Sequence, residues 1–285
     1  MRDEFTLTGA VASPRLAGRL APHAVLAIAL VFTLGPIVWM VGMSLKQPQD
    51  VLTNPLNPLP LDPTLANYRA VFDASDVVTQ LRNSLVFAGG VTLGHLAIAV
   101  PAAYAFARWS FRGAALLFGS MVFTLSVPFV VTYLPNFVLL SRTDQLNTYQ
   151  GLILPQMATG YGIFLLTQHF RSFPLAIFDA ARVDGATEWQ VLVRILLPAM
   201  RAPILAVGLF IFISTWNELV WPLLVATDPG KHVLTVGLTQ FSALEGGTQF
   251  GPLMAAALTT ALPTLVLYWF FRRQVLSVVH DGALN

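Results

Sequence analysis

The chain contains no cysteine and very little charge. Cysteine is absent from all 285 residues, which excludes disulfide bonds and thiolate metal sites. Only 11% of the residues are charged, whereas an ordinary soluble domain has about 25%. The mean hydropathy is +0.68. Such a chain has too little polar surface to be solvated by water alone, so much of it is expected to lie in lipid.

Lysine is also scarce, since the chain has only Lys46 and Lys231. A phosphate-binding loop needs glycine, four further residues, then glycine, lysine and serine or threonine, because backbone amides and the lysine hold the phosphates. Lys231 is followed by His232, and position 225 is valine, so this motif is missing. Any ATP that drives this protein must therefore be hydrolysed by another chain.

An intramembrane enzyme is not supported either. No HExxH motif occurs, and no apolar segment carries an aspartate. The histidines are scattered along the chain at positions 23, 95, 169, 232 and 280, without the convergence that a metal site requires. We expect this chain to bind no cofactor, no metal and no nucleic acid of its own.

Long hydrophobic segments dominate the sequence. A helix needs about 20 apolar residues to cross a bilayer, and six segments qualify. Five of them carry no Asp, Glu, Lys or Arg, and the fifth in order carries one acid, Glu218. The predicted fold class is therefore an all-α, polytopic membrane protein with six transmembrane helices. The predicted spans are residues 22–44, 84–107, 114–140, 148–167, 202–225 and 253–271.

The distribution of positive charge predicts the orientation, because cytoplasmic loops carry an excess of Lys and Arg. With a cytoplasmic N-terminus, eleven basic residues lie inside and five outside. Both termini are therefore expected in the cytoplasm. The chain then divides into a tail at 1–21, a transmembrane domain at 22–272 with a large internal loop at about 168–201, and a second tail at 273–285. The five external basic residues are Lys46, Arg69, Arg82, Arg142 and Lys231.

The internal loop carries the motif "DAARVDGATEWQ" at 179–190, which predicts a helix, a turn and a second helix. Ser172 is the expected cap of the first helix, and a left-handed Gly185 is expected to end it. Thr187 and Gln190 have the spacing of a capping box that begins the second helix. An interfacial amphipathic hairpin without a partner is one interpretation. Alanines beside the turn favour another, in which a second protein approaches the backbone closely.

The same motif resembles the EAA signature of permease subunits of ABC importers. Asp179-Ala180-Ala181, Asp184-Gly185-Ala186 and Leu197-Pro198 match it in order and spacing, with Asp179 in place of the usual Glu. Residues 215–228, "TWNELVWPLLVATD", resemble the fifth-span region of the carbohydrate-uptake branch, the maltose-type second permease group. The resemblance implies that the loop is a coupling helix that docks on an ATPase. Its expected contact residues are Asp179, Ala180, Ala181, Arg182, Asp184, Gly185 and Ala186.

The resemblance also implies a type I importer permease fold in the bacterial inner membrane, surrounded by lipid. Such a chain forms half of the pathway for a sugar or a related polar solute. The implied partners are a second permease subunit, two ATPase subunits that use ATP and Mg²⁺, and an extracytoplasmic solute-binding protein. A permease for glycerol phosphate or glycerophosphodiesters is the alternative. The absence of Lys and Arg from the predicted spans favours neutral sugars.

Polar residues inside the spans suggest where the solute passes. Trp216, Asn217 and Glu218 form a cluster suited to a sugar, since intramembrane acids face the bundle interior. A purely structural role in joining helices is the competing interpretation. An ion-coupled carrier is the other class considered, but its only mid-membrane ionisable candidates are Glu218 and His95. We expect His95, with Gly89, Gly90 and Gly94, to mark close helix packing, and residues 126–135 to form a broken helix.

Overall fold

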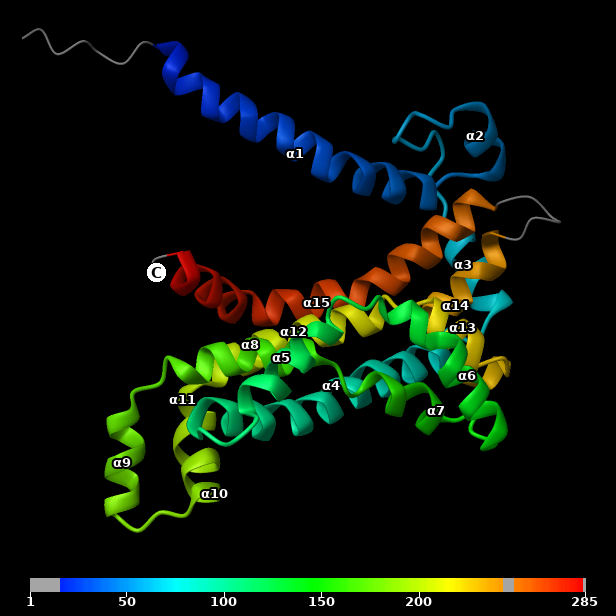
Figure 1. The fold of residues 1–285 in the computed structure, drawn as a ribbon. Helices are drawn as coiled ribbons and strands as arrows, with labels where there is room; N and C mark the ends of the chain where they lie inside the picture. Colours follow the sequence, from blue (N-terminus) through cyan, green and yellow to red (C-terminus); the bar gives the residue numbers. More distant parts are fainter. Residues whose placement is uncertain (1–15, 243–248, 284–285) are drawn as a thin grey trace, which may run out of the picture.

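The computed structural model describes residues 16–242 and 249–283, and within these ranges the chain forms helices and no strand (Figure 1). The long helices are α1 (Leu16–Ser44), α4 (Val77–Arg108), α12 (Arg201–Trp216) and α15 (Phe250–Ala283). The remaining α-helices are α2 (Pro48–Thr53), α3 (Ala66–Ala74), α5 (Ala114–Thr124), α6 (Tyr133–Arg142), α7 (Tyr149–Ile153), α8 (Gly160–Arg171), α9 (Leu175–Val183), α10 (Glu188–Gln190), α11 (Leu197–Ala199), α13 (Val220–Val225) and α14 (Leu234–Leu238). Short 3₁₀ turns are η1 (Phe129–Thr132), η2 (Leu154–Gln156), η4 (Pro229–Lys231) and η5 (Thr239–Ser242), and η3 (Val191–Leu196) is a π-helix.

The predicted first, second and sixth spans are continuous helices, and α1, α4 and α15 are each long and apolar enough to cross a membrane. Helix α4 begins seven residues before the predicted span, because the Asp76 side chain accepts a hydrogen bond from the Thr79 N–H at 3.0 Å and caps it. Helix α15 continues beyond the predicted span to Ala283. Of the two predicted tails, residues 1–15 and 284–285 lie outside the described residues.

The other three predicted spans are interrupted. In the third, α5 and the pair η1–α6 meet at a bend of 92°, which confirms the break predicted at 126–135. The fourth is divided among α7, η2 and α8, and the fifth is divided between α12 and α13. Pro128 and Pro155 lie at two of these breaks, where their missing N–H groups cannot continue a helix. By length and apolarity the described residues provide three spans, or up to five if each bent pair is one span, so the number six stays a prediction.

Helix α4 forms the centre of the bundle, with α8 and α12 packed against it. Small residues allow these approaches. A Cβ on Gly90 or Gly94 would meet the side chain of Ile153 or Met157, and a Cβ on Gly162 would lie 2.1 Å from His95 Nε2. The expected close packing around Gly90, Gly94 and His95 is therefore confirmed. Gly89 differs, because a Cβ there would meet nothing within 4 Å.

Helix α1 stands apart from the bundle and meets α15 near its C-terminal end (Figure 1). Its apolar side chains are exposed along most of its length, and Phe32, for example, is 78% exposed. Near its end Met43 and Ser44 become buried. This surface requires lipid or another chain to cover it, which is the environment that the composition predicts.

At the end of the molecule opposite the α9–α10 hairpin, polar side chains form hydrogen bonds that hold the loops in place. Lys46 is fully buried, where its ammonium donates to the Asn54 carbonyl at 2.5 Å and lies 3.9 Å from the Asp50 carboxylate. The Asn83 amide donates to the carbonyls of Gly230 and His232, which fixes the loop before α14 onto α4. This end is thus tied to the bundle by hydrogen bonds to backbone groups of its loops.

The α4–α8 contact predicts a specific cost for adding one methyl group. Gly162→Ala should lower the free energy of unfolding by about 1–3 kcal/mol, because the new Cβ overlaps the buried His95 ring. Gly89→Ala is the matched control, since it adds the same methyl group in open space within a helix, and it should be neutral or slightly stabilising. Thermal unfolding in detergent measures both, and equal effects would contradict this packing.

Candidate functional site

The predicted hairpin exists and extends from one end of the bundle (Figure 1). Helix α9 ends at Val183 with Asp184 as its C-cap residue, and Gly185 follows with a φ of +79°, in the left-handed region. The Ala186 N–H donates to the Ala181 carbonyl at 2.9 Å, and the Gly185 N–H donates to the Arg182 carbonyl at 3.0 Å. These two bonds form a Schellman motif, so the predicted glycine stop is confirmed.

The second arm of the hairpin begins with the predicted capping box. The Gln190 N–H donates to Thr187 Oγ1 at 3.3 Å, and the Thr187 N–H donates to Gln190 Oε1 at 2.8 Å. The predicted cap by Ser172 is wrong. Ser172 ends α8 and its hydroxyl donates to the His169 carbonyl, while Pro174 occupies the N-cap position of α9. Both sides of the turn are therefore closed by local bonds that make it stiff.

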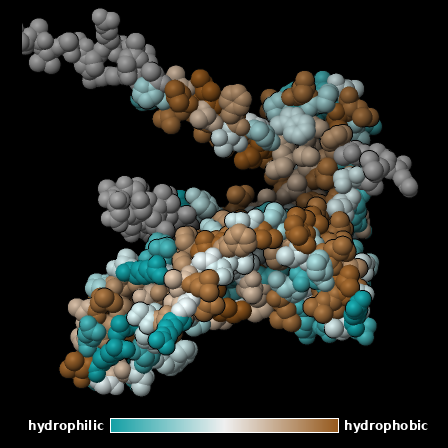
Figure 2. Space-filling view, viewed as in Figure 1, coloured by the Kyte–Doolittle hydropathy of each residue, from teal (hydrophilic) through white to brown (hydrophobic). Residues whose placement is uncertain are grey.

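The tip of the hairpin exposes apolar side chains. Val183 is 89% exposed and Trp189 is 70% exposed. A Cβ on Gly185 would meet nothing within 4 Å, so the turn itself is bare on its outer side. Figure 2 shows hydrophilic side chains gathered over this end of the molecule. An exposed apolar tip with a polar rim is a surface that fits a protein partner.

The predicted contact residues separate into two groups. Asp179, Ala180, Arg182, Asp184 and Gly185 are exposed, whereas Ala186 is half-buried and Ala181 is buried. Ala181 therefore serves the packing of the hairpin on the bundle, where its small side chain lies among core residues. The exposed group remains available to a partner.

A polar contact joins the hairpin to α4. The Tyr104 hydroxyl donates to Glu188 Oε2 at 2.5 Å, and the Arg182 guanidinium donates through Nε to Glu188 Oε1 at 3.1 Å. Arg182 also forms an ion pair with Glu188. The hydrogen bond from Tyr104, followed by that from Arg182, holds the pKa of Glu188 below its usual value, so this carboxylate stays ionised. The hairpin is thereby hydrogen-bonded to α4.

A second contact involves Arg108 at the end of α4. Its Nη2 lies 3.7 Å from Asp179 Oδ1, and its guanidinium lies over the Phe178 ring at 5.1 Å. Asp179 stands where the EAA signature usually has glutamate, and it faces a residue of its own chain. Tyr104 and Arg108 were not predicted as site residues. No local pattern could identify Tyr104, because its partner Glu188 is 84 residues away.

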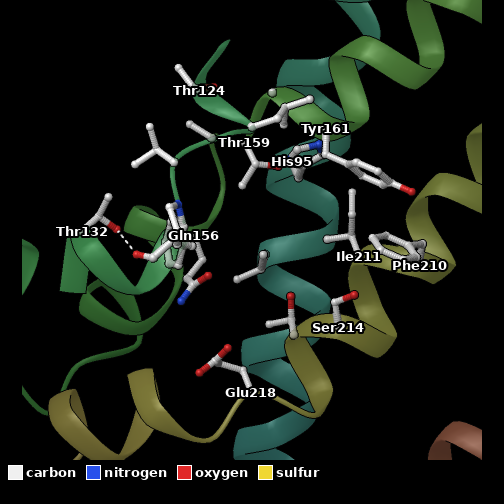
Figure 3. Close-up of a pocket in the computed structure, with 18 residues that line it drawn as sticks. His95, Thr124, Thr132, Gln156, Thr159, Tyr161, Phe210, Ile211, Ser214 and Glu218 are labelled. Carbon is white, nitrogen blue, oxygen red and sulfur yellow. Dashed lines mark hydrogen bonds between the residues drawn. The ribbon is translucent and has the colours of Figure 1, made fainter. Parts of the chain in front are cut away.

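A half-open cavity of about 640 Å³ lies against α4, beside the helix breaks (Figure 3). Helix α4 contributes Val91 and His95 to its wall. The close-up shows Glu218 at one end, with His95 and Thr159 at the other. Backbone between the interrupted helices forms much of the lining, which is how broken helices commonly serve transport proteins. The other polar or aromatic lining residues are Thr124, Phe129, Thr132, Gln156, Tyr161, Phe210, Ser214 and Thr215.

Glu218 combines a structural and a cavity-facing role. Its Oε1 accepts hydrogen bonds from the Val220 and Trp221 N–H groups at 3.0 and 3.2 Å, so it caps the first turn of α13. The Tyr133 hydroxyl donates to the same oxygen at 3.1 Å. Among the described residues, no group donates to Oε2. One carboxylate oxygen therefore holds the broken helix, and the other is free for a solute.

Trp216 and Asn217, the other two predicted residues, do not line the cavity. The Trp216 indole is buried and donates to the Thr260 carbonyl of α15 at 3.0 Å. The Asn217 amide donates to the Ile213 carbonyl at 2.8 Å, within its own helix. The Trp216 side chain thus joins α12 to α15, the Asn217 side chain bonds within α12, and only Glu218 of the three lines the cavity.

Two other polar side chains of the cavity wall were not predicted to contact a solute. The Nδ1 atom of His95 lies 2.9 Å from the Met157 carbonyl, and its Nε2 is buried without a hydrogen-bond partner in the part of the chain that the structure describes. Gln156 Nε2 is also buried and unpaired there. Pro155 is a sequence signal that could have found its neighbour Gln156, because a proline marks the break there, whereas no such signal marks His95 within the continuous helix α4.

Comparison with known proteins agrees with this architecture. Residues 96–279 match the family described as "Binding-protein-dependent transport system inner membrane component". The chain is 29% identical to the diacetylchitobiose uptake system permease protein NgcG of Streptomyces coelicolor, over 92% of this chain and 88% of that protein. It is 30% identical to the sn-glycerol-3-phosphate transport system permease protein UgpE of Pectobacterium atrosepticum, over 88% and 93%. A bacterial ABC transporter involved in the import of the acidic polysaccharide alginate has a chain of the same fold, with a TM-score of 0.80, 20% identity and coverage of 92% and 98%.

The Tyr104–Glu188 contact predicts how firmly the hairpin is held. Tyr104→Phe removes one hydrogen bond to a carboxylate and should lower the free energy of local opening by about 1.5 kcal/mol. Amide hydrogen exchange over residues 175–190 should then be roughly tenfold faster. Tyr149→Phe is the control, because it removes a hydroxyl that donates to Asn83 Oδ1 at the opposite end. Unchanged exchange in Tyr104→Phe would contradict a link between the hairpin and α4.

Proposed function

The chain belongs to the family of binding-protein-dependent transport system inner membrane components, and we propose that it passes a neutral sugar while its α9–α10 hairpin receives the motion of an ATPase. It is a transmembrane permease subunit of an ATP-binding-cassette importer. Within that role, the single observation that carries the proposal is the bare hairpin turn at Gly185, which local hydrogen bonds close.

The hairpin is the proposed point of entry for the energy of ATP. Closure of two ATPase subunits would move a hairpin seated on them, and the closed turn would transmit that movement without bending. The hydrogen bond between Glu188 and Tyr104 passes this movement to α4, which also contributes Val91 and His95 to the cavity wall. The displacement of α4 then changes the side of the membrane to which the cavity opens. Asp179, Ala180, Arg182, Asp184 and Gly185 are the proposed contact residues on the partner's side, and Ala181 and Ala186 support them from within.

The proposed assembly consists of this chain, a second permease, two ATPase subunits and an extracytoplasmic solute-binding protein. The ATPase subunits would use ATP and Mg²⁺, whereas this chain binds neither. The hairpin end and both termini are assigned to the cytoplasm, in agreement with the excess of arginine there. The exposed apolar surface of α1 is consistent with a second chain or lipid beside it.

The chemistry of the cavity supports a neutral, hydroxyl-rich solute. Ser214, Thr132 and Thr159 offer hydroxyl groups, and Gln156 offers an unpaired amide donor. The rings of Tyr161 and Phe210 lie 4.7 Å apart and give an apolar face. Such a wall, mostly apolar with a few oriented polar groups, is typical of small-molecule sites. A sugar presents both hydroxyl edges and apolar ring faces to it.

A phosphorylated solute is the alternative that the similarity to the glycerol phosphate permease suggests. Among the described residues that line the cavity, Glu218 is the charged one, and neither Lys nor Arg is present. A carboxylate with a free oxygen repels a phosphate, whereas it accepts hydrogen bonds from sugar hydroxyls. The wall contributed by this chain therefore favours a neutral sugar.

The docking role predicts that bulk at the hairpin turn abolishes transport. Gly185→Glu should abolish solute uptake and recruitment of the ATPase, because a charged side chain would occupy the bare turn. Gly113→Glu is the matched control, since Gly113 also has a positive φ, of +86°, with open space around its Cα. Both variants carry the same charge and a similar backbone strain of about 1–2 kcal/mol, but only one lies on the hairpin. Normal uptake by Gly185→Glu, measured in proteoliposomes with the folded complex, would refute docking at this turn.

The free oxygen of Glu218 predicts an effect on the solute rather than on folding. Glu218→Gln keeps an Oε1 acceptor for Val220, Trp221 and Tyr133 and replaces Oε2 with an amide nitrogen. Uptake at limiting sugar should fall about tenfold, the loss expected for one hydrogen bond to a charged group, while thermal stability is retained. Asn217→Ala is the control outside the cavity and should transport normally. Unchanged uptake by Glu218→Gln would exclude a direct contact with the solute.

A further inference from the structure

A second groove lies at the hairpin end of the bundle, outside the central cavity. It has a volume of about 650 Å³ and is formed by the C-terminal ends of α4 and α8 and the start of α5. Two arginines contribute to it, Arg108 from α4 and Arg171 from α8. Apolar and aromatic side chains make up most of the remaining wall, namely Phe106, Trp109, Phe118 and Leu175. The groove therefore combines two positive charges with an apolar surface.

Neither arginine has a full set of acceptors. Arg108 Nε and Nη2 are buried and have no hydrogen-bond partner within residues 16–242 and 249–283. The distance of 3.7 Å from Nη2 to Asp179 is too long for a hydrogen bond, and that aspartate is 69% exposed. Arg171 lies over the Phe118 ring at 5.1 Å and takes part in none of the ion pairs of the described residues. A guanidinium group has five N–H donors, so the groove holds two unpaired buried donors of Arg108 beside the exposed Arg171.

The apolar wall identifies what kind of anion fits. Beyond Phe118 the surface continues along α5, where Leu116 is 75% exposed and Leu117 is 56% exposed. A free phosphate would use the arginines but leave this wall uncovered. A phospholipid places a phosphate beside hydrocarbon chains and would use both. Basic pockets at the cytoplasmic ends of transmembrane helices bind lipid headgroups in this way, and tryptophan collects at the same depth.

We propose that this groove binds the phosphate of an anionic phospholipid, with Arg108 and Arg171 as its ligands and the acyl chains lying along Phe118 and α5. The site rests on the proposed function only for its orientation, which places the hairpin end at the cytoplasmic leaflet. Arg108 also faces Asp179 on α9. Arg108 therefore contacts both the proposed lipid and the hairpin, so the lipid composition of the membrane would affect how the hairpin is held.

The test counts lipid on the purified, intact transporter by native mass spectrometry, without ATP or solute. Phosphatidylglycerol and phosphatidylcholine are offered in equal amounts. The wild type should retain phosphatidylglycerol preferentially, and Arg171→Gln should retain it about fivefold less tightly, the factor for one arginine near an anionic surface. Arg171→Lys keeps the charge and should retain most of the binding. Arg112→Gln is the matched control, because this exposed arginine lies in the loop between α4 and α5 and does not line the groove.

Three outcomes would overturn the proposal. Equal losses in Arg112→Gln and Arg171→Gln would mean diffuse attraction to the membrane surface rather than a site. Displacement of phosphatidylglycerol by inorganic phosphate at similar concentration would indicate a free anion as the ligand. Retention that appears only after the ATPase subunits are removed would mean that a protein partner covers the groove. Lipid binding is measured without transport, so this result can be interpreted even if the docking or solute assays contradict the proposed function.

Discussion

The constraint on which the structure depends is the need to satisfy backbone groups where helices break inside a lipid environment. An unpaired backbone N–H or carbonyl in hydrocarbon costs several kcal/mol. This chain interrupts three of its six predicted spans, and side chains supply partners at the breaks. Glu218 accepts from the exposed N–H groups of α13, the Trp221 indole donates to the Leu152 carbonyl, and His95 lies against the Met157 carbonyl. The cavity lies against α4, beside these breaks.

This arrangement explains why α4 occupies the centre of the molecule. It is the continuous helix against which the broken ones are packed, and close contacts at Gly90, Gly94 and Gly162 set their distances. The same helix contributes His95 to the cavity and, further along, Tyr104 and Arg108 to the root of the hairpin. One rigid element therefore connects the hairpin with the cavity wall. In the proposed function that connection converts movement at the hairpin into a change in access to the cavity.

Features that depend on neighbouring residues could be predicted from the sequence, whereas features that depend on distant pairs could not. The left-handed Gly185, the capping box of Thr187 and Gln190 and the break at 126–135 follow from local backbone rules, and the structure confirms each. The prediction for Ser172 is wrong because a serine two residues before a proline can stand either at the end of one helix or at the start of the next. The interruption of the fourth span was not predicted, although Pro155 and Gln156 lie within its segment, because a proline inside a span can bend a helix without dividing it. The inward turn of Trp216 toward α15 and the partnership of Tyr104 with Glu188 arise from helix packing between segments 44 and 84 residues apart, which composition cannot reveal.

The two oxygens of the Glu218 carboxylate have different roles, and this difference has a consequence for how transporters of this kind diversify. One oxygen accepts hydrogen bonds from three donors that keep the broken helix in shape, so the folding of the chain favours a side chain with this acceptor oxygen whatever solute is carried. Changes in solute preference must then accumulate at positions that line the cavity without supporting the backbone, such as Ser214. A lineage that shifts from one solute to another would keep this acceptor oxygen and vary the residues around it.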